Sequence, residues 1–309
     1  MEQSILLVGV PTDHGSRRTG CLMGPDALRA ADISTRLSRL GYDVSDAGNI
    51  TTDPTEEIHH PNPKIHHLAD YAALIGKLDQ YCETMLKEGP VPVFMGGDHC
   101  IAAGILPALA RASEEAGQEQ FLLWLDAHTD FQTLESTDTG NLHGTPVTYI
   151  IGDPSFDGVI PRPAAPIKPE NICMMGIRSV DPAEQARIAR TSIDVHDMRA
   201  IDEFGVATPL RRFIDRVRRA NGRLHVSLDV DFLDPEIAPA VGTTVSGGVN
   251  HREAHLIMEI LYDSGLVTSV DIAELNPFLD VRGKTSELIV DLIASLFGQR
   301  VLDTHRRSI

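Results

Sequence analysis

Short apolar segments alternate with amphipathic stretches of helical periodicity along the whole chain, and this alternation restricts the fold more than any other feature. The strand-like segments are rich in β-branched residues and usually end at Gly, Asp or Pro; they comprise residues 5–10, 91–95, 121–125, 172–175, 225–228 and 267–272. Helical patterns lie between them, at residues 25–40, 68–87, 101–115, 209–220, 252–264 and 285–297. Such repeated β-α units with nearly continuous apolar strands predict a parallel sheet covered by helices on both faces.

The length of 309 residues allows one large α/β domain or two smaller ones. No internal repeat or flexible linker separates two halves. The segment 153–171 carries five prolines and is interpreted as a loop on the surface, not as a domain boundary. We therefore expect a single domain over residues 1–309.

Composition and charge exclude several classes of partner. The net charge of −17 would repel a phosphate backbone, so we expect no nucleic-acid binding. The sequence holds no apolar stretch of the roughly 18–20 residues that span a bilayer, and its first residues are typical of a strand, not of a signal peptide. The cysteines form no C-x-x-C pair, which favours reduced thiols in the cytoplasm; they are Cys21, Cys82, Cys100 and Cys173.

Carboxylates and imidazoles follow three of the apolar segments directly, at the strand ends where ligands bind in open α/β sheets. Residues 126–130 space such groups at i, i+2 and i+4, and residues 229–231 repeat the i, i+2 spacing. In an extended chain this spacing places the side chains on one face. The candidate metal ligands are His99, Asp126, His128, Asp130, Asp229 and Asp231.

Four carboxylates and two imidazoles are more than one tetrahedral zinc ion binds. They suit two ions that share bridging carboxylates, and the lack of thiolates favours a harder metal such as Mn²⁺. Two ions about 3.5–4 Å apart can activate a water molecule for attack, so the pattern predicts a hydrolase. A single cluster of this kind is more often a turn, but three after strands of one sheet form a joint signal. Asp98 leaves two interpretations open, a helix N-cap or a support for the ligands.

Five ordered motifs resemble the ureohydrolase family and, within it, the arginases. They are G-G-D-H at 96–99, D-A-H-T-D at 126–130, G-N-L-H-G at 140–144, S-L-D-V-D-F-L-D-P at 227–235 and D-I-A-E-L-N-P at 271–277. With G-C-L-M-G-P-D-A-L-R at 20–29, the likeness covers nearly the whole chain. The resemblance implies an α/β fold, a three-layer α/β/α sandwich around a central, mostly parallel sheet of about eight strands. It also implies a homo-oligomer, either a trimer or a hexamer.

The resemblance further implies two Mn²⁺ per chain and assigns each predicted ligand. His99, Asp126, Asp130 and Asp229 would bind one ion. His128 and Asp231 would bind the other ion together with Asp126 and Asp229, which would bridge the pair.

The family's reaction is the hydrolysis of a guanidinium group, here of L-arginine to L-ornithine and urea, through a hydroxide that bridges the two metals. The resemblance implies that Glu274 pairs with the guanidinium nitrogens, by charge-assisted hydrogen bonds. Asp130 would stabilise the tetrahedral intermediate, and His143 would act as acid or proton shuttle, a role that suits imidazole near neutral pH. Thr243 would line the same pocket.

Substrate contacts are implied by two further segments. In arginases the loop after D-A-H-T-D binds the α-carboxylate, and a later acidic segment binds the α-amino group. Gln132 and Thr139 stand where animal arginases have asparagine and serine, and Ser179 replaces a second aspartate. The expected substrate-binding residues are Gln132, Thr139, Asn141, Asp181, Glu184 and Thr243.

Three rival interpretations stay open. A sister ureohydrolase would act on agmatine or another guanidino acid, a deacetylase of related fold would hold a single zinc, and an inactive relative would only bind metal or a partner. The carboxylate-binding loop favours arginine over agmatine, and the second imidazole argues against one zinc.

Overall fold

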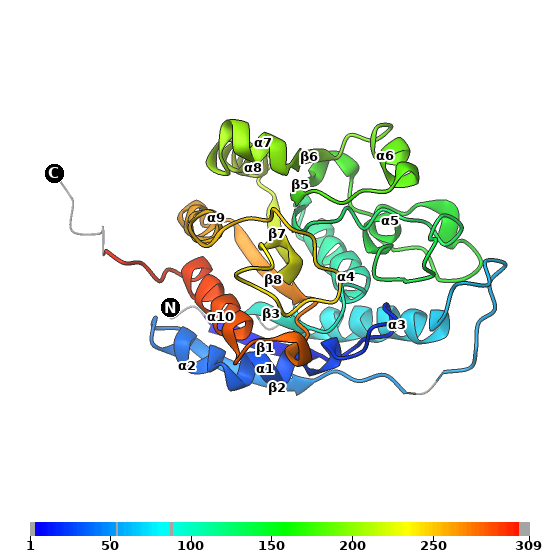
Figure 1. The fold of residues 1–309 in the computed structure, drawn as a ribbon, viewed down its shortest axis with the longest axis horizontal. Helices are drawn as coiled ribbons and strands as arrows, with labels where there is room; N and C mark the ends of the chain where they lie inside the picture. Colours follow the sequence, from blue (N-terminus) through cyan, green and yellow to red (C-terminus); the bar gives the residue numbers. More distant parts are fainter. Residues whose placement is uncertain (1–3, 54, 87–88, 303–309) are drawn as a thin grey trace.

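Eight strands form one sheet in which every neighbouring pair runs parallel, in the order β2-β1-β3-β8-β7-β4-β5-β6 (Figure 1). The computed structural model describes residues 4–53, 55–86 and 89–302. The strands are β1 (Ser4–Val10), β2 (Asp43–Asn49), β3 (Val91–Gly96), β4 (Gln120–Leu125), β5 (Ile172–Ile177), β6 (Asp194–Asp197), β7 (Arg223–Asp229) and β8 (Val267–Ala273). The predicted parallel sheet of about eight strands is confirmed.

Helices cover both faces of this sheet. One face packs against α1 (Gly24–Ala30), α2 (Ile33–Ser38), α7 (Met198–Phe204), α8 (Ala207–Arg219), α9 (His251–Ser264) and α10 (Lys284–Leu296). The other packs against α3 (Leu68–Met85), α4 (Ile101–Glu115), α5 (Pro146–Ile150) and α6 (Pro182–Ile188). Apolar side chains of both strand faces are buried in two core clusters, as the near-continuous apolar strands require. The predicted three-layer α/β/α sandwich is therefore confirmed.

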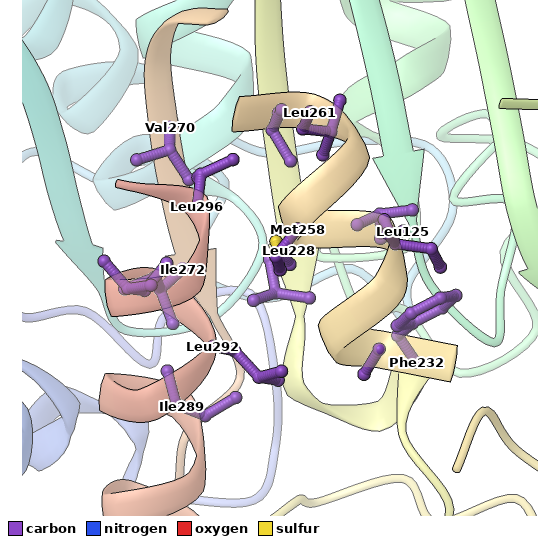
Figure 2. Packing of buried hydrophobic residues seen from close by; sticks show 14 of the residues in the cluster. Leu125, Leu228, Phe232, Met258, Leu261, Val270, Ile272, Ile289, Leu292 and Leu296 are labelled. Carbon is purple, nitrogen blue, oxygen red and sulfur yellow. The ribbon is translucent and has the colours of Figure 1, made fainter. Parts of the chain in front are cut away.

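Figure 2 shows how the first of these clusters is packed. Side chains of α9 and α10 lie against β7 and β8; those labelled are Met258 and Leu261, Ile289, Leu292 and Leu296, and Leu228, Val270 and Ile272. All of these strand residues have no exposed surface. Their burial anchors the two strands whose ends carry part of the candidate site.

Two strands were not predicted, and both are edge strands of the sheet. β2 reads D-V-S-D-A-G-N and is largely exposed, while β6 has only four residues. An edge strand lacks a neighbour on one side and is incompletely covered, so it needs no continuous apolar run. The apolar pattern that identified the six inner strands is therefore weak at the edges.

The predicted helix at residues 25–40 is interrupted. α1 ends at Ala30 and α2 starts at Ile33, because Asp32 adopts a left-handed backbone conformation with φ of 69°. No glycine or proline marks the break, so helical periodicity continues across it. For the helix predicted at residues 68–87, the last residue, Lys87, lies outside the described residues.

The proline-rich segment 153–171 is a loop, as predicted, with short 3₁₀ turns at Pro154–Phe156 and Pro169–Asn171. It is not a plain surface excursion, since Phe156, Ile160 and Ile167 are buried in the second core cluster. None of the helices in the described part of the chain combines the length and apolarity that crossing a bilayer requires.

The strand order decides which loops meet. β3, β8, β7 and β4 are consecutive neighbours in the middle of the sheet. Because the strands are parallel, their carboxyl ends lie along one edge, where ligands bind in folds of this kind. The last residues of these four strands and the segments that follow them contain all six predicted metal ligands and Glu274.

Candidate metal centre and active site

The imidazole of His99 points into a group of three carboxylates. Its Nδ1 lies 3.1 Å from Asp126 Oδ2, 3.1 Å from Asp229 Oδ2 and 3.3 Å from Asp130 Oδ2. His99 follows β3, Asp126 and Asp130 follow β4, and Asp229 is the last residue of β7, so three strand ends supply them. His99, Asp126 and Asp130 offer ligand atoms close enough together to hold one metal ion.

A second group adjoins the first. Nδ1 of His128 lies 2.9 Å from Asp231 Oδ2 and 3.5 Å from Asp126 Oδ1. Asp126, His128 and Asp231 form another set that could hold an ion. Asp126 thus presents one oxygen to each imidazole, the arrangement expected of a carboxylate that bridges two ions.

The electrostatics of this cluster fit bound cations. Burial raises the pKa of Asp229, and the nearby carboxylates of Asp231 and Asp126 raise it further. Burial and the charge of Asp126 raise the pKa of Asp130 to about 7. Among the described residues, His99 Nδ1 and Asp126 Oδ2 find no hydrogen-bond partner, although both are buried and lie only 3.1 Å apart. Buried unpaired groups of this kind are costly, and a cation between them would satisfy both.

The loop before α4 is built around close backbone contacts. A Cβ atom on Gly97 would lie 1.8 Å from the carbonyl oxygen of Thr12, so only glycine allows this approach. The carboxylate of Asp98 accepts hydrogen bonds from the backbone N–H of Gly15 at 2.6 Å and of Cys100 at 3.1 Å. The N-cap of α4 is Cys100 and the helix has no side-chain cap, so the N-cap interpretation of Asp98 is wrong. The contacts of its carboxylate instead brace the loop that carries His99.

A cavity of about 170 Å³ opens above the carboxylates. Most predicted site residues line it: His128, Asp130, Gln132, Thr139, Asn141, His143, Glu184, Asp229, Asp231 and Thr243. His99 and Asp126 lie beneath its floor and are fully buried. Thr243 donates a hydrogen bond to Asp231 Oδ2 at 3.4 Å, so the loop after β7 folds back over the cluster.

The residues expected to bind the α-groups of the substrate form a connected wall. Gln132 Nε2 donates to Asp181 Oδ2 at 2.7 Å, and Asp181 Oδ1 caps α6 by accepting from the backbone N–H of Glu184. Glu184 Oε1 in turn accepts from Thr129 and from the backbone N–H of Phe131. Glu184 therefore reaches the cavity while it also holds the loop of D-A-H-T-D in place.

Asn141 contrasts with these paired groups. Its side-chain oxygen is buried, lies at the cavity, and finds no hydrogen-bond partner within the part of the chain that the structure describes. An unpaired buried amide oxygen is available to a ligand donor, or the amide can turn its N–H groups towards a ligand acceptor.

Glu274 and His143 form an ion pair beside the cavity. Glu274 Oε1 lies 2.8 Å from His143 Nδ1 and accepts a hydrogen bond from the backbone N–H of His99 at 2.9 Å. Burial would lower the pKa of His143, but the Glu274 carboxylate outweighs it and raises the pKa to about 9. Glu274 is only 3% exposed and does not line the cavity. A ligand therefore reaches this carboxylate only where His143 gives way.

Two residues near the site were missed in the sequence. Cys21 Sγ donates to Glu274 Oε2 at 3.6 Å, and burial raises the pKa of this thiol, which keeps it protonated. Arg178 donates to the backbone carbonyls of Asp231 at 2.6 Å and Val245 at 2.7 Å, and so ties the metal cluster to the loop that carries Thr243. No local pattern identifies these roles, because Glu274 lies more than fifty residues from Cys21, and Asp231 and Val245 lie as far from Arg178.

Replacing Arg178 with methionine is expected to destabilise the fold by about 2 kcal/mol, because buried carbonyl oxygens would lose their donors. Urea denaturation of the metal-free protein measures this change. Arg18→Met is the matched control, since exposed Arg18 donates to one carbonyl, that of Gly242. Equal stability of the two variants would contradict the role of Arg178 as a clamp.

Fold and ligand groups together define a metal-dependent hydrolase built on an α/β/α sandwich, and comparisons with known proteins narrow this class. The sequence model of the Arginase family matches residues 3–298. An arginase of Brucella melitensis biotype 1 is 55% identical over 297 residues, covering 96% of this chain and 97% of the relative. An arginase of Bacillus subtilis is 38% identical, covering 98% of this chain and all of the relative. The solved arginase of Bacillus caldovelox superposes with a TM-score of 0.88 at 36% identity, over 97% of this chain and 100% of that one.

The chain belongs to the arginase family. It is an amidinohydrolase of the ureohydrolase type, as its motifs predict, and the family uses a binuclear metal site.

Proposed function

We propose that this enzyme hydrolyses L-arginine to L-ornithine and urea with two Mn²⁺ ions bound by the six predicted ligands. The observation that carries the proposal is the convergence of two imidazoles and four carboxylates beneath one cavity. The relatives at 55% and 38% identity, both named arginases, support arginine as the substrate. Carboxylate and imidazole ligands without a thiolate favour Mn²⁺ over softer ions.

The two ligand groups divide between the ions. His99 and Asp130 would hold one ion and His128 and Asp231 the other, with Asp126 and Asp229 shared between them. When bound, such a pair of ions lowers the pKa of a water molecule and orients it towards the carbon to be attacked. The crowded carboxylates would then be compensated by cations rather than by protons.

The residues beside the cavity supply the rest of the chemistry. Glu274 would pair with the planar guanidinium, which takes the place that His143 occupies on its Oε1. His143 holds a proton near neutral pH, because its pKa is raised to about 9. Displaced from Glu274, it can pass that proton to the leaving ornithine nitrogen as the carbon–nitrogen bond breaks. The amine then leaves in neutral form instead of as an anion.

The wall of the cavity would distinguish arginine from agmatine. The amide and hydroxyl groups of Gln132, Thr139 and Asn141 line the cavity and suit a carboxylate. The carboxylate of Glu184 also lines it and suits an ammonium group, and that of Asp181, which is outside the lining, reaches it only through its hydrogen bond with Gln132. Agmatine has no α-carboxylate and would leave the amide and hydroxyl groups unpaired.

The test of the proposed function is urea release by Mn²⁺-loaded protein from L-arginine, agmatine and guanidinobutyrate in parallel. Urea from agmatine but not from arginine would overturn the proposed substrate in favour of the sister activity.

Replacing Gln132 with alanine is expected to raise KM for arginine about tenfold and to change kcat little, because a hydrogen bond to a charged substrate group is lost. Steady-state urea production measures both constants. Gln118→Ala is the control, since Gln118 lies away from the cavity, where its side chain donates to the carbonyl of Asn221 and accepts from Arg223. An unchanged KM would show that Gln132 does not contact the substrate.

Removing the metal is expected to lower the melting temperature by roughly 5 °C or more, since an ion at a hundred times its Kd stabilises the fold by about 2.7 kcal/mol. Calorimetry before and after chelation measures the shift, and added Mn²⁺ should restore it. Elemental analysis should find two ions per chain. One zinc per chain would instead favour a deacetylase, and two ions without hydrolysis of any guanidino compound would favour an inactive relative.

We further propose that the chain acts as one domain over residues 1–309, forms a trimer or hexamer, and works in the cytoplasm. The single sheet that runs through the chain supports one domain. Light scattering coupled to size exclusion tests the assembly, and a monomer would contradict it.

A further inference from the structure

Four buried polar side chains form a stripe on β7 and β8 beneath the candidate metal centre. His225 and Ser227 of β7 pair in register with Ser269 and Asp271 of β8, and all four have no exposed surface. Paired residues of neighbouring strands point to the same face of a sheet. The opposite face of these strands contributes apolar side chains to the first core cluster, among them Leu228, Val270 and Ile272 (Figure 2). Burying four polar groups is costly unless each is bonded, so the stripe calls for an explanation.

The stripe is one continuous hydrogen-bonded chain that starts at a predicted metal ligand. His99 Nε2 lies 2.8 Å from Ser227 Oγ, and Ser227 Oγ donates to Asp271 Oδ1 at 2.9 Å. The other oxygen of Asp271 lies 2.7 Å from His225 Nε2. His225 Nδ1 lies 2.8 Å from Ser269 Oγ, which closes the chain at its far end.

The protons in this chain can run in one direction only. A carboxylate accepts hydrogen bonds and donates none, so the single hydroxyl proton of Ser227 is committed to Asp271. Ser227 can therefore only accept from His99, which must carry its ring proton on Nε2. This tautomer leaves a lone pair on Nδ1, the atom that faces Asp126, Asp130 and Asp229. In the ionised form that a metal ligand takes, these three carboxylates accept and do not donate, so the lone pair of Nδ1 is free to ligate a cation.

We propose that Asp271, acting through Ser227, is a positioning residue that fixes the tautomer and the rotation of His99 so that Nδ1 is presented to the metal. The proposal rests on the metal site of the proposed function. Trp124 supplies the complementary restraint, because its ring stacks on His99 at 4.0 Å with an interplanar angle of 8°. The stack holds the plane of the imidazole, and the hydrogen bond to Ser227 holds its rotation within that plane.

Breaking this hydrogen-bonded chain should lower the affinity for one of the two ions, the one at His99. Ser227→Ala leaves Nε2 without an acceptor and allows either ring nitrogen to carry the proton. The affinity of the ion at His99 should fall about 10- to 100-fold, the usual cost of losing an outer partner of a ligating histidine. The ion at His128 should keep its affinity, since His128 is not part of the hydrogen-bonded chain. Asp271→Asn should have the same effect: His225 holds the amide oxygen on its side, so the amide N–H faces Ser227 and reverses the proton order.

The experiment titrates Mn²⁺ into metal-free protein and follows free Mn²⁺ by electron paramagnetic resonance. It compares the unmodified chain with Ser227→Ala, Asp271→Asn and the double variant. The losses of Mn²⁺ affinity should not be additive in the double variant, because both substitutions break the same hydrogen-bonded chain. Ser295→Ala is the matched control: Ser295 is also buried and lies 2.8 Å from a histidine nitrogen, that of His255, but away from the site. Melting of each metal-free variant by circular dichroism verifies that it folds.

The outcomes separate the two ideas. The proposal is supported if both single variants lose affinity for one of the two ions. The double variant should then lose no more than either single variant, and Ser295→Ala should lose none. Unchanged affinity for both ions in Ser227→Ala, or fully additive losses, would overturn the proposal while leaving the metal site intact. Failure of the unmodified chain to bind a Mn²⁺ pair would overturn the metal site and the proposal together.

Discussion

Replacing Asp126 with asparagine is expected to lower urea production about a thousandfold, which corresponds to several kcal/mol of lost transition-state stabilisation by the ions. Asp126 presents one oxygen to His99 and the other to His128, so the substitution removes a charge shared by both groups and replaces the oxygen facing His99 by an amide nitrogen, which cannot ligate a cation. The amide keeps the size of the side chain and its acceptor for the backbone N–H of His128. Initial rates at saturating Mn²⁺ and arginine, with metal content measured on the same samples, test this expectation.

Stability distinguishes this result from simple misfolding. His128 and His99 hold the pKa of the Asp126 carboxylate below its usual range although the group is buried, so its charge stabilises the metal-free fold. The same charge raises the pKa of Asp130, Asp229 and Asp231, and the repulsion relieved by its removal offsets part of the loss. Metal-free Asp126→Asn should therefore still melt cooperatively, somewhat below the metal-free parent. Asp138→Asn is the control, because it removes the same charge from an exposed carboxylate paired with Lys64. Two bound ions and full turnover in Asp126→Asn would refute the bridging assignment.

Replacing Trp124 with alanine is expected to destabilise the metal-free protein by about 4 kcal/mol, the usual cost of removing a large buried aromatic side chain. Trp124 lies on β4, has no exposed surface, and supports the ring of His99. Denaturation by urea without metal measures the loss, since bound ions would add their own stabilisation.

Trp124→Phe is the informative companion to this variant. The indole N–H finds no hydrogen-bond partner among the described residues, so its removal costs nothing in hydrogen bonding. Phenylalanine keeps a ring against His99 and should lose well under half of the stability that alanine loses. A loss below about 1 kcal/mol for Trp124→Ala would mean that the site collapses to fill the space, and that the stack does not hold His99.

The inner strands and the motif residues could be predicted because they depend on local patterns. A strand buried on both faces must be apolar throughout, and this requirement identified the six inner strands. The same requirement did not identify the edge strands β2 and β6, since an edge strand is partly exposed and need not be apolar. The break between α1 and α2 at Asp32 was not predicted either, because a residue in the left-handed conformation within a periodic stretch leaves no pattern in the sequence.

The candidate site divides in the same way. The i, i+2 and i+4 spacing of Asp126, His128 and Asp130 predicts a shared face from the sequence alone. The pairing of His143 with Glu274 joins residues 131 positions apart, and that of Ser227 with Asp271 joins residues 44 apart. These contacts follow from loops that fold together and from the neighbouring positions of β7 and β8, neither of which any local pattern encodes.

The sequence by itself determined the fold class, the metal-binding residue types and the chemistry that they can support, because burial and ligand preference act on each segment separately. Only the tertiary structure decided which partners each of these groups has. It pairs His143 with Glu274 and lets Arg178 donate to the loop that carries Thr243. It also places a buried chain of hydrogen bonds behind His99. The physical reason is that hydrogen bonds are short and directional, so their partners are defined only once the order and register of the strands have brought distant segments together.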